Sequence, residues 1–268
     1  MQTKDVAFLS TSGKAAYDQI FLAWSAGNQT EAERMLREAA RKYGSELRLA
    51  FFAALLVRSR FDIQGAAPIL AFVANRAPGT RQGLAAQYML AIDQRRNVPQ
   101  SFAALGKLAM ETRPVEPLIV WLYAIAARTL RQNRPGIAAY TLLLKHVKVG
   151  SALIHQTFAN LLDGDKRYAE ALPHRQLAVK LEPAPWSYDG LAMTLYRLRR
   201  FDESLKIFEK AAPKSGSTFP LIWNHWGVVL SAMGRNKEAL EKMERAVQLD
   251  PNDSVFRHDR DTIRARLR

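Results

Sequence analysis

The stretch PLIWNHWGVVLSAMGRNKEALEKMERAVQLDPN, residues 220–252, decides the fold of this chain. Its large and small apolar residues recur three or four positions apart, which is the period of an α-helix. They form two groups separated by a glycine, and a proline that cannot continue a helix closes the second group. The positions are Trp223, Trp226, Gly227 and Leu230, then Gly234 in the turn, then Ala239, Met243, Ala246 and Pro251. The stretch therefore predicts a hairpin of two helices.

The same pattern recurs along the chain, which indicates a repeat architecture. The clearest copies are Tyr188, Leu191, Ala192, Leu195, Ser204, Phe208, Ala211 and Gly216; His155, Phe158, Ala159, Leu162, Ala171, Arg175, Ala178 and Pro183; and Ala50, Ala53, Ala54, Val57, Ala66, Leu70, Val73 and Pro78. Arg175 is a polar exception at a position that is otherwise apolar. The small residue that opens each second helix falls at Ala32, Ala66, Ala103, Ala138, Ala171, Ser204 and Ala239. These positions are 33 to 37 residues apart, with Ala103 and Ala138 open to displacement by one residue.

This spacing resembles the tetratricopeptide repeat consensus of large, small and proline positions. The resemblance implies an all-α fold, a right-handed α-solenoid of about seven helix hairpins with a C-terminal capping helix. We expect one solenoid over residues 1–268, with the register inside 84–151 left open. The predicted repeats span roughly 13–46, 47–80, 84–117, 119–151, 152–184, 185–219 and 220–253, and the capping helix spans 254–268.

Local sequence signals agree with this architecture. Short turns inside the hairpins are expected at Gly27, Gly164 and Gly234, where a positive φ is often needed. Prolines are expected to end second helices, and the apolar residues after Pro251 predict a capping helix with one buried stripe. That stripe is Val255, Phe256, Ile263 and Leu267. No stretch alternates β-branched residues between turn dipeptides, so we expect no sheet.

The amino-acid composition excludes several classes of function. The chain has no cysteine, which removes disulfides and thiolate chemistry, and its net charge of +14 favours anionic partners. The longest apolar runs, 49–57 and 117–127, are shorter than the ~18 residues of a membrane span. The first residues lack the pattern of a secretory signal, so a cytoplasmic location is expected.

No motif for catalysis is found. The five histidines show no pair four residues apart and no carboxylate array with metal-ligand spacing, so we expect no metal site. Gly13 and Lys14 lack the earlier glycine of a phosphate-binding loop, and no G-x-S-x-G occurs. We therefore expect no enzyme and no cofactor.

In the family that the sequence resembles, first helices line a concave groove and contact ligands at fixed positions. Carrying these positions over predicts a partner-binding surface rich in aromatic residues and arginine, which often dominate binding energy. Its residues are Tyr17, Phe21, Trp24, Phe51, Phe52, Arg58, Tyr88, Met89, Arg95, Arg96, Tyr123, Arg131, Asn160, Trp186, Asp189, Tyr196, Arg197, Asn224 and His225. Aromatic residues at helical spacing can equally pack in a core, and that alternative stays open.

Arginines also recur where first helices end, which predicts a basic stripe that engages carboxylates or phosphates. They are Arg58, Arg60, Arg95, Arg96, Arg128, Arg131, Arg134, Arg197, Arg199, Arg200 and Arg235. Some members of the family grip the C-terminal carboxylate of chaperone tails, but of the residues implied for that mode only Asn160 is present here, so we do not expect it.

The leading hypothesis is a protein-interaction scaffold or adaptor whose groove takes a partner segment that is acidic with apolar anchors. A basic solenoid that binds nucleic acid or another polyanion is the first alternative, and the salt dependence of binding would separate the two. A regulatory subunit or region of a larger enzyme assembly is the second alternative.

Overall fold

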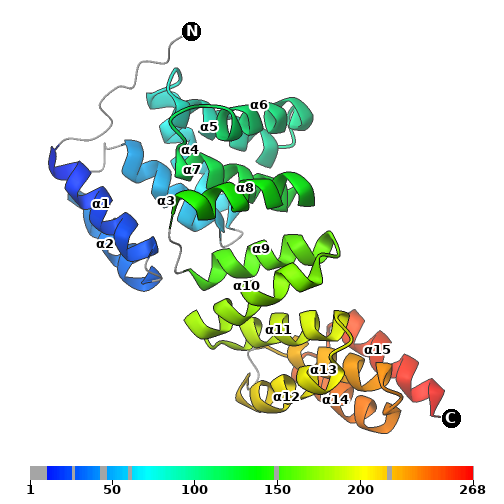
Figure 1. Cartoon of the computed structure of the whole chain (residues 1–268). Helices are drawn as coiled ribbons and strands as arrows, with labels where there is room; N and C mark the ends of the chain where they lie inside the picture. Colours follow the sequence, from blue (N-terminus) through cyan, green and yellow to red (C-terminus); the bar gives the residue numbers. More distant parts are fainter. Residues whose placement is uncertain are drawn as a thin grey trace. The chain divides into compact units, whose positions relative to one another are not determined.

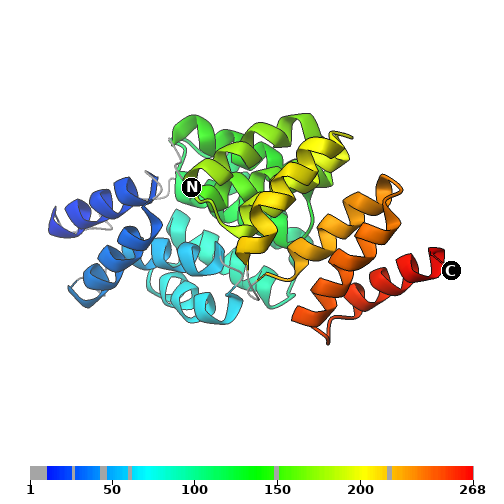
Figure 2. The same ribbon diagram turned by 90° about the horizontal axis from the view of Figure 1, so that it is seen from below.

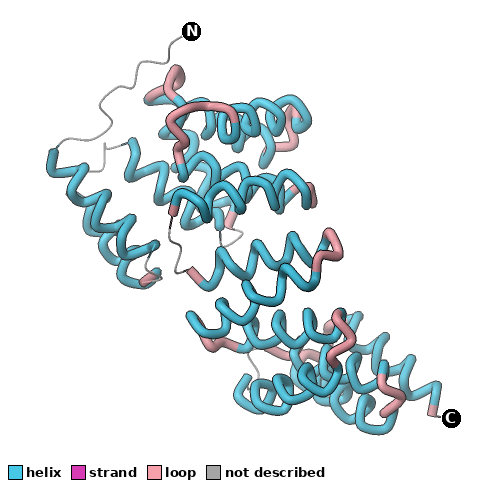
Figure 3. The backbone as a smooth tube through the Cα atoms, viewed as in Figure 1, coloured by secondary structure: helices cyan, strands magenta, loops and turns pink. Residues whose placement is uncertain are grey.

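We describe the protein from a computed structural model, which defines residues 11–25, 28–42, 47–59, 62–147, 151–215 and 219–267. In these ranges the chain forms fifteen α-helices and no strand (Figures 1 and 3). The predicted all-α class is confirmed. The chain divides into two compact units, Met1–Ser151 and Ala152–Arg268, which we describe separately as the N-terminal unit and the C-terminal unit.

The N-terminal unit contains four helix pairs whose members pack against each other (Figure 1). Its helices are α1 (Thr11–Ser25), α2 (Gln29–Lys42), α3 (Leu47–Ser59), α4 (Ile63–Arg76), α5 (Arg81–Asp93), α6 (Val98–Met110), α7 (Pro117–Thr129) and α8 (Asn133–His146). The predicted starts of the third and fourth repeats, residues 84 and 119, fall three and two residues inside α5 and α7.

The C-terminal unit contains three helix pairs and one further helix. Its helices are α9 (Ala152–Gly164), α10 (Tyr168–Leu181), α11 (Pro185–Arg197), α12 (Phe201–Ala211), a 3-10 turn η1 (Ala212–Ser215), α13 (Leu221–Ala232), α14 (Asn236–Leu249) and α15 (Ser254–Arg266). Each helix packs on the next along the chain, and the last three are drawn from orange to red in Figure 2.

The first backbone hydrogen bond of each second helix gives a common register for the hairpins. In every pair, one amide donates to the carbonyl four residues earlier, just before the helix begins. The donors are Ala32, Ala66, Ser101, Gly136, Ala171, Ser204 and Ala239, and all of them are buried. Their spacings are 34, 35, 35, 35, 33 and 35 residues. Ser101 and Gly136 replace Ala103 and Ala138, which are exposed.

The turns inside the hairpins place one residue in the left-handed region, and most of these residues are basic. Arg131, Lys166 and Arg199 have φ of 54°, 61° and 61°, and Gly234 has φ of 77°. The next amide in each turn bonds back to the carbonyl five residues earlier, as in a Schellman motif. The prediction for Gly164 was wrong, because it ends α9 and Lys166 takes the left-handed position. Gly27 lies outside the described residues.

The turn between α5 and α6 is one residue longer than the others. It contains two left-handed residues, Arg95 with φ of 56° and Asn97 with φ of 44°. Asn97 then starts the next helix by accepting the first bond from Ser101. The expected alanines, Ala103 and Ala138, each lie two residues after the true donors Ser101 and Gly136, whose spacing of 35 residues is that of most other pairs.

Second helices end where proline was expected to end them. The last helical residues Arg76, Leu181 and Leu249 are each followed by one capping residue and then by the proline. A proline cannot donate the amide bond that a further turn would require. The position of Gly216, which replaces this proline in one repeat, lies outside the described residues.

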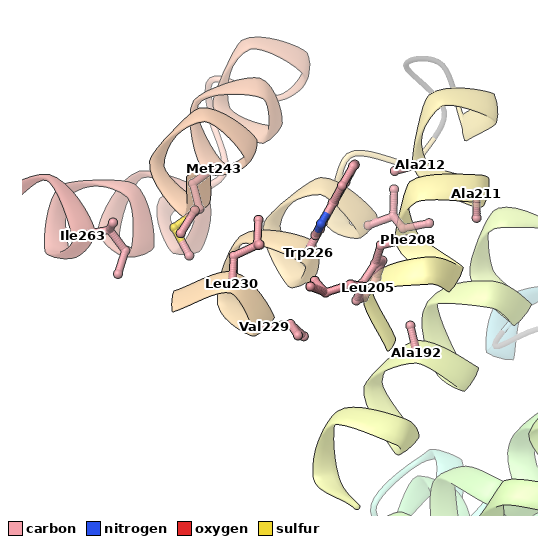
Figure 4. Close-up of a cluster of buried hydrophobic side chains, with 12 residues drawn as sticks. Ala192, Leu205, Phe208, Ala211, Ala212, Trp226, Val229, Leu230, Met243 and Ile263 are labelled. Atoms are coloured by element: carbon pink, nitrogen blue, oxygen red, sulfur yellow. The ribbon is translucent and has the colours of Figure 1, made fainter. Parts of the chain in front are cut away.

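The core of the C-terminal unit lies between α11, α12, α13 and α14 (Figure 4). Phe208 and Met243 are almost completely buried there, and the missing side chain of Gly227 lets α13 approach α14 closely. A Cβ atom at Gly227 would lie 2.6 Å from Cγ of Met243 and 3.0 Å from the carbonyl oxygen of Ala239. The small residue of the consensus therefore has a steric cause.

Helix α15 covers the last hairpin with only part of the predicted stripe. Phe256 and Ile263 are buried, whereas Val255 and Leu267 are 57% and 41% exposed. The prediction was wrong for the latter two because they lie at the ends of α15, outside the row of residues that faces α13 and α14. Asn224 Nδ2 donates to Asp259 Oδ2 at 2.8 Å and ties α15 to α13.

Candidate binding groove

The C-terminal unit contains an open groove of about 510 Å³ between its first helices α9, α11 and α13 and the start and inner side of α10. Most of its lining is polar or charged. The lining residues are Gln156, Asn160, Asp163, Gly164, Lys166, Tyr168, Arg175, Asp189, Gly190, Met193, Arg197 and His225.

A buried arginine forms the floor of this groove. The Arg175 side chain is 3% exposed, and its Nη2 donates to Asp163 Oδ2 at 2.8 Å and to Asn160 Oδ1 at 2.7 Å. Burial lowers the pKa of Arg175, while the Asp163 carboxylate opposes that shift. A guanidinium starts from so high a pKa that it stays charged. The floor is therefore a fixed positive charge.

The Asp163 carboxylate is fully engaged by its neighbours. Besides Arg175, its Oδ2 accepts from Arg197 Nη1 at 2.8 Å and from Thr194 Oγ1 at 3.0 Å. Arg175 Nε in turn donates to Thr194 Oγ1 at 3.2 Å. The groove contains a second carboxylate, Asp189, so two carboxylates face Arg175, Arg197 and Lys166. This leaves a surplus of one positive charge and unused donors.

Two buried polar atoms at the floor have no hydrogen-bond partner, namely Nη1 of Arg175 and Oε1 of Gln156. Both side chains lie against Gly190, where a Cβ atom would be 2.6 Å from Arg175 Nη1 and 2.5 Å from Gln156 Nε2. Only a residue without a side chain fits there unless these groups move. On the neighbouring wall, His225 Nδ1 contacts Asp189 Oδ1 at 2.8 Å.

A smaller pocket of about 300 Å³ adjoins the groove. It is lined by Tyr196, Val228, Ser231, Ala232, Met243, Asp259, Thr262, Ile263 and Arg266. Tyr196 lies one helical turn after Met193 on α11, and Val228 lies one turn after His225 on α13. The two pockets therefore follow each other along the same pair of helices. The second has an apolar wall of Val228, Met243 and Ile263 beside the polar side chains of Ser231, Asp259 and Arg266.

The predicted groove residues of the first two repeats lie in the interior of the N-terminal unit. Trp24 and Phe52 are buried, with ring centroids 5.6 Å apart, and Trp121 of α7 lies 4.7 Å from Trp24. Tyr17 and Phe21 belong to the same cluster, because their ring centroids lie 5.9 and 6.1 Å from that of Phe52. These aromatic side chains pack between helices, as the open alternative stated.

Other predicted residues of the N-terminal unit are also enclosed. Phe51 and Met89 are completely buried, and Tyr88 is half-buried. Tyr123 is 8% exposed and packs on Phe102, 4.9 Å between ring centroids. Its ring lies against α6, where a Cβ atom at Gly106 would be 2.9 Å from Tyr123 Cζ. Such side chains offer a partner little or no surface.

Arg58 is the most completely buried charge of the N-terminal unit. Its guanidinium donates twice to Asp93, at 2.8 and 3.2 Å, and once to Thr129 Oγ1 at 3.1 Å. The exposed fractions of the two charged side chains are 1% and 3%. This network ties together the C-terminal ends of α3, α5 and α7.

In the C-terminal unit, three arginines of the predicted basic stripe form ion pairs with a carboxylate. Arg197, Arg200 and Arg235 pair with Asp163, Glu203 and Glu238 respectively. Arg199 lies 5.8 Å from the ring centroid of Phe201. Arg95, Arg96 and Arg131 are exposed, while Arg60 lies outside the described residues.

In the C-terminal unit the structure brings four predicted residues together in the groove, namely Asn160, Asp189, Arg197 and His225. Tyr196 lines the adjoining pocket, whereas Trp186 contributes its backbone carbonyl to Gln156 Nε2 at 3.3 Å. Asn224 is buried against α15. Sequence reasoning missed Asp163, Lys166, Tyr168 and Arg175 as groove residues. The one signal for them was the polar exception at Arg175.

Within the described part of the chain, no set of three or more His, Asp or Glu side chains is arranged to hold a metal ion. None of the helices defined by the structure combines the length and apolar character needed to cross a membrane.

Known proteins share this architecture. Tetratricopeptide repeat models match residues 186–215 and 220–253. The structure of YrrB, described as a TPR protein with an unusual peptide-binding site, superposes with a TM-score of 0.51 at 14% identity, over 84% of this chain and 97% of YrrB. The Cut9–Hcn1 hetero-tetramer of the APC/C gives a TM-score of 0.64 at 11% identity, over 98% of this chain and 51% of that one.

A relative in sequence is the chloroplastic PsbB mRNA maturation factor Mbb1 of Chlamydomonas reinhardtii, 27% identical over 110 residues. The match covers 41% of this chain and 16% of Mbb1. Tandem helix hairpins with a common register, together with these matches, define a helical repeat protein. Residues 186–215 and 220–253 match tetratricopeptide repeats, and the chain shares the fold of tetratricopeptide repeat proteins.

Proposed function

We propose that the protein is a protein-interaction scaffold that holds an extended partner segment in the groove of the C-terminal unit. The repeat family and its fold support a scaffold rather than an enzyme. The observation that carries the finer proposal is the succession, along α11 and α13, of a donor-rich pocket and a second pocket that has one apolar wall. A cytoplasmic location stays a prediction from the sequence.

The polar pocket favours an acidic residue of the partner. Arg175, Arg197 and Lys166 bring three positive charges to it, against the two carboxylates of Asp163 and Asp189, and Asp163 is already engaged by both arginines. Carboxylates accept paired hydrogen bonds from guanidinium groups, and such bonds are stronger than those between neutral groups. A carboxylate in the groove would balance the surplus charge.

The apolar wall of the second pocket favours a hydrophobic side chain next to that acidic residue. Val228, Met243 and Ile263 supply its apolar walls. Interfaces usually derive most of their affinity from a few buried anchors, and the pocket offers room for one. The proposed ligand is therefore a short segment that combines Asp or Glu with an apolar residue nearby.

Selection of random twelve-residue peptides on the purified full chain tests this proposal. Enriched peptides should carry an acidic residue beside an apolar one, and fluorescence anisotropy should measure their Kd. Arg197→Glu should raise Kd by about tenfold or more, equal to about 1.4 kcal/mol. Val228→Asp should weaken the same peptides by a similar factor.

Two matched controls make the same charge changes at residues outside the groove. The first control is Arg200→Glu, because Arg200 lies three residues after Arg197 but pairs with Glu203 outside the groove. The second is Val255→Asp, which changes an exposed residue of α15. Both controls should bind like the unchanged protein. Peptides without acidic residues, or equal losses in controls and groove variants, would refute the proposal.

A further inference from the structure

Two neighbouring turns of the N-terminal unit form an arginine-rich surface that the proposed peptide groove does not use. The turns are residues 94–97, after α5, and 130–132, after α7. The two turns lie side by side because Arg58 Nη2 donates to both Asp93 and Thr129, which are the last residues of α5 and α7. Arg95, Arg96 and Arg131 therefore project from adjacent turns, and all three are exposed.

No acidic side chain balances these arginines within either turn. The second helices that follow, α6 and α8, contain no Asp or Glu at all. The equivalent turns of the C-terminal unit differ, because Arg167, Arg200 and Arg235 each pair with the glutamate three residues later, at 2.6 to 2.7 Å. Charge compensation is thus the rule in one unit and is missing at these two turns of the other.

The remaining side chains of the surface are amides, apart from Leu130, which is partly buried at the start of the second turn. Residues 94–97 read QRRN and residues 131–134 read RQNR, so Gln and Asn accompany the arginines. The exposed large hydrophobic residues of the described chain all lie elsewhere. A protein partner would find no apolar anchor here, whereas a phosphate backbone is held by arginine and amide groups alone.

We propose that the turns after α5 and α7 bind the phosphate backbone of a nucleic acid. Arginine binds phosphate oxygens in bidentate fashion, and adjacent turns present three guanidinium groups to successive phosphates. The contact reads charge and not base sequence. It is independent of the peptide groove, which lies in the other unit.

Fluorescence anisotropy with a labelled twenty-residue oligouridylate tests the proposal on the full chain. Binding should weaken with salt, since about 0.7 counterions are released per phosphate contact on a single strand. The triple variant R95E/R96E/R131E should bind at least about tenfold more weakly at 50 mM salt, and its plot of log Kd against log salt should be flatter by about 2.

The control is K206E/K237E/R257E, which makes the same change in net charge at exposed residues of the C-terminal unit. It should keep most of the affinity, because long-range attraction alone is screened by salt. Circular dichroism should show that both triple variants remain folded. An oligothymidylate should bind as tightly as the oligouridylate.

Three outcomes would overturn the proposal. One is failure of the unchanged protein to bind either oligonucleotide at 50 mM salt, and another is equal loss of affinity in the two triple variants. The third is displacement of the oligonucleotide by polyglutamate at equal charge concentration, which would assign the surface to an acidic protein. None of these results bears on peptide binding by the groove, which Arg197→Glu tests separately.

Discussion

The inner positions of the first helices are closed in the N-terminal unit and open in the C-terminal unit. In the first, large side chains such as Trp24, Phe52 and Trp121 fill the space between helices. In the second, Asn160, Gly190 and Met193 occupy the lining and leave a groove. The comparison teaches that a repeat consensus fixes the frame of the helices, while side-chain size at inner positions decides whether a binding surface exists.

The buried ion pairs of the two units differ in the same way. Arg58 and Asp93 form an enclosed pair in the N-terminal unit, whereas Arg175 and Asp163 form the floor of a groove that a ligand can reach. An enclosed pair stabilises the fold only if both partners are present. A pair at the floor of a groove can also offer its spare donors to a ligand.

Removing one partner of the enclosed pair should give the largest effect. Asp93→Ala leaves the Arg58 charge buried and unpaired, so we expect a loss of about 3–5 kcal/mol of stability. Hydrogen exchange of α3, α5 and α7 should report this loss. The double variant R58M/D93L should recover most of it, and Glu238→Ala, which removes one partner of an exposed pair, should cost far less stability. Equal costs for Asp93→Ala and Glu238→Ala would contradict the contrast between enclosed and exposed pairs.

Filling the floor of the groove should have a smaller effect on stability. Gly190→Ala places a methyl group within 2.6 Å of Arg175 Nη1, and overpacking of this kind typically costs about 1–3 kcal/mol. Peptides selected on the unchanged protein should also bind more weakly. Gly79→Ala is the matched control, since its Cβ would meet no atom within 4 Å. Urea unfolding that shifts equally in both variants would show that the floor of the groove is not tightly packed.

Acid should weaken the C-terminal unit through a histidine pair. His155 Nδ1 and His174 Nδ1 lie 3.1 Å apart, and burial together with His155 lowers the pKa of His174 to about 4. The folded state therefore binds fewer protons than the unfolded state between pH 6.5 and 4, so stability is complete above pH 6.5 and falls as the pH drops. We expect a loss of about 1–2 kcal/mol, because solvent screens a half-buried group.

Urea unfolding of the unchanged protein and of His174→Phe at pH 7 and pH 4.5 measures this effect. The variant should lose less stability between the two values. Titration of His174 by NMR with a midpoint near 6.5 would contradict the expected shift.

The smallest effect is expected at the exposed pairs of the C-terminal turns. Arg200→Gln with Glu203→Gln removes a solvent-exposed ion pair, whose net contribution is small. The midpoint of urea unfolding should not change measurably. A clear shift would mean that these pairs hold the turns in place, and it would weaken the contrast with the unpaired arginines after α5 and α7.

The sequence predicted the helices well because their signals are local. Helix ends follow from Pro183 and Pro251, and close packing follows from Gly227, each by a short-range steric cause. The register of α5 to α8 was less accessible, because Ser101 and Gly136 differ from the expected alanines.

The groove could be predicted only in part, because its shape depends on contacts between repeats. The same first-helix position holds buried Phe52 in one unit, and no local pattern distinguishes it from the open positions of the other. Arg175 is the part of the groove that the sequence indicated, because an arginine at an otherwise apolar repeat position implies polar partners nearby. Its partners Asp163 and Thr194 come from α9 and α11, and spacing alone does not reveal them.

The long turn at Asn97 has a consequence for protein engineering. Each second helix starts its hydrogen bonding afresh from the residue that precedes it, so the additional residue at this turn leaves the phase of α6 intact. Length changes are therefore absorbed locally instead of being passed to later hairpins. An epitope tag or fluorescent reporter inserted between Arg96 and Asn97 should leave every downstream repeat correctly folded.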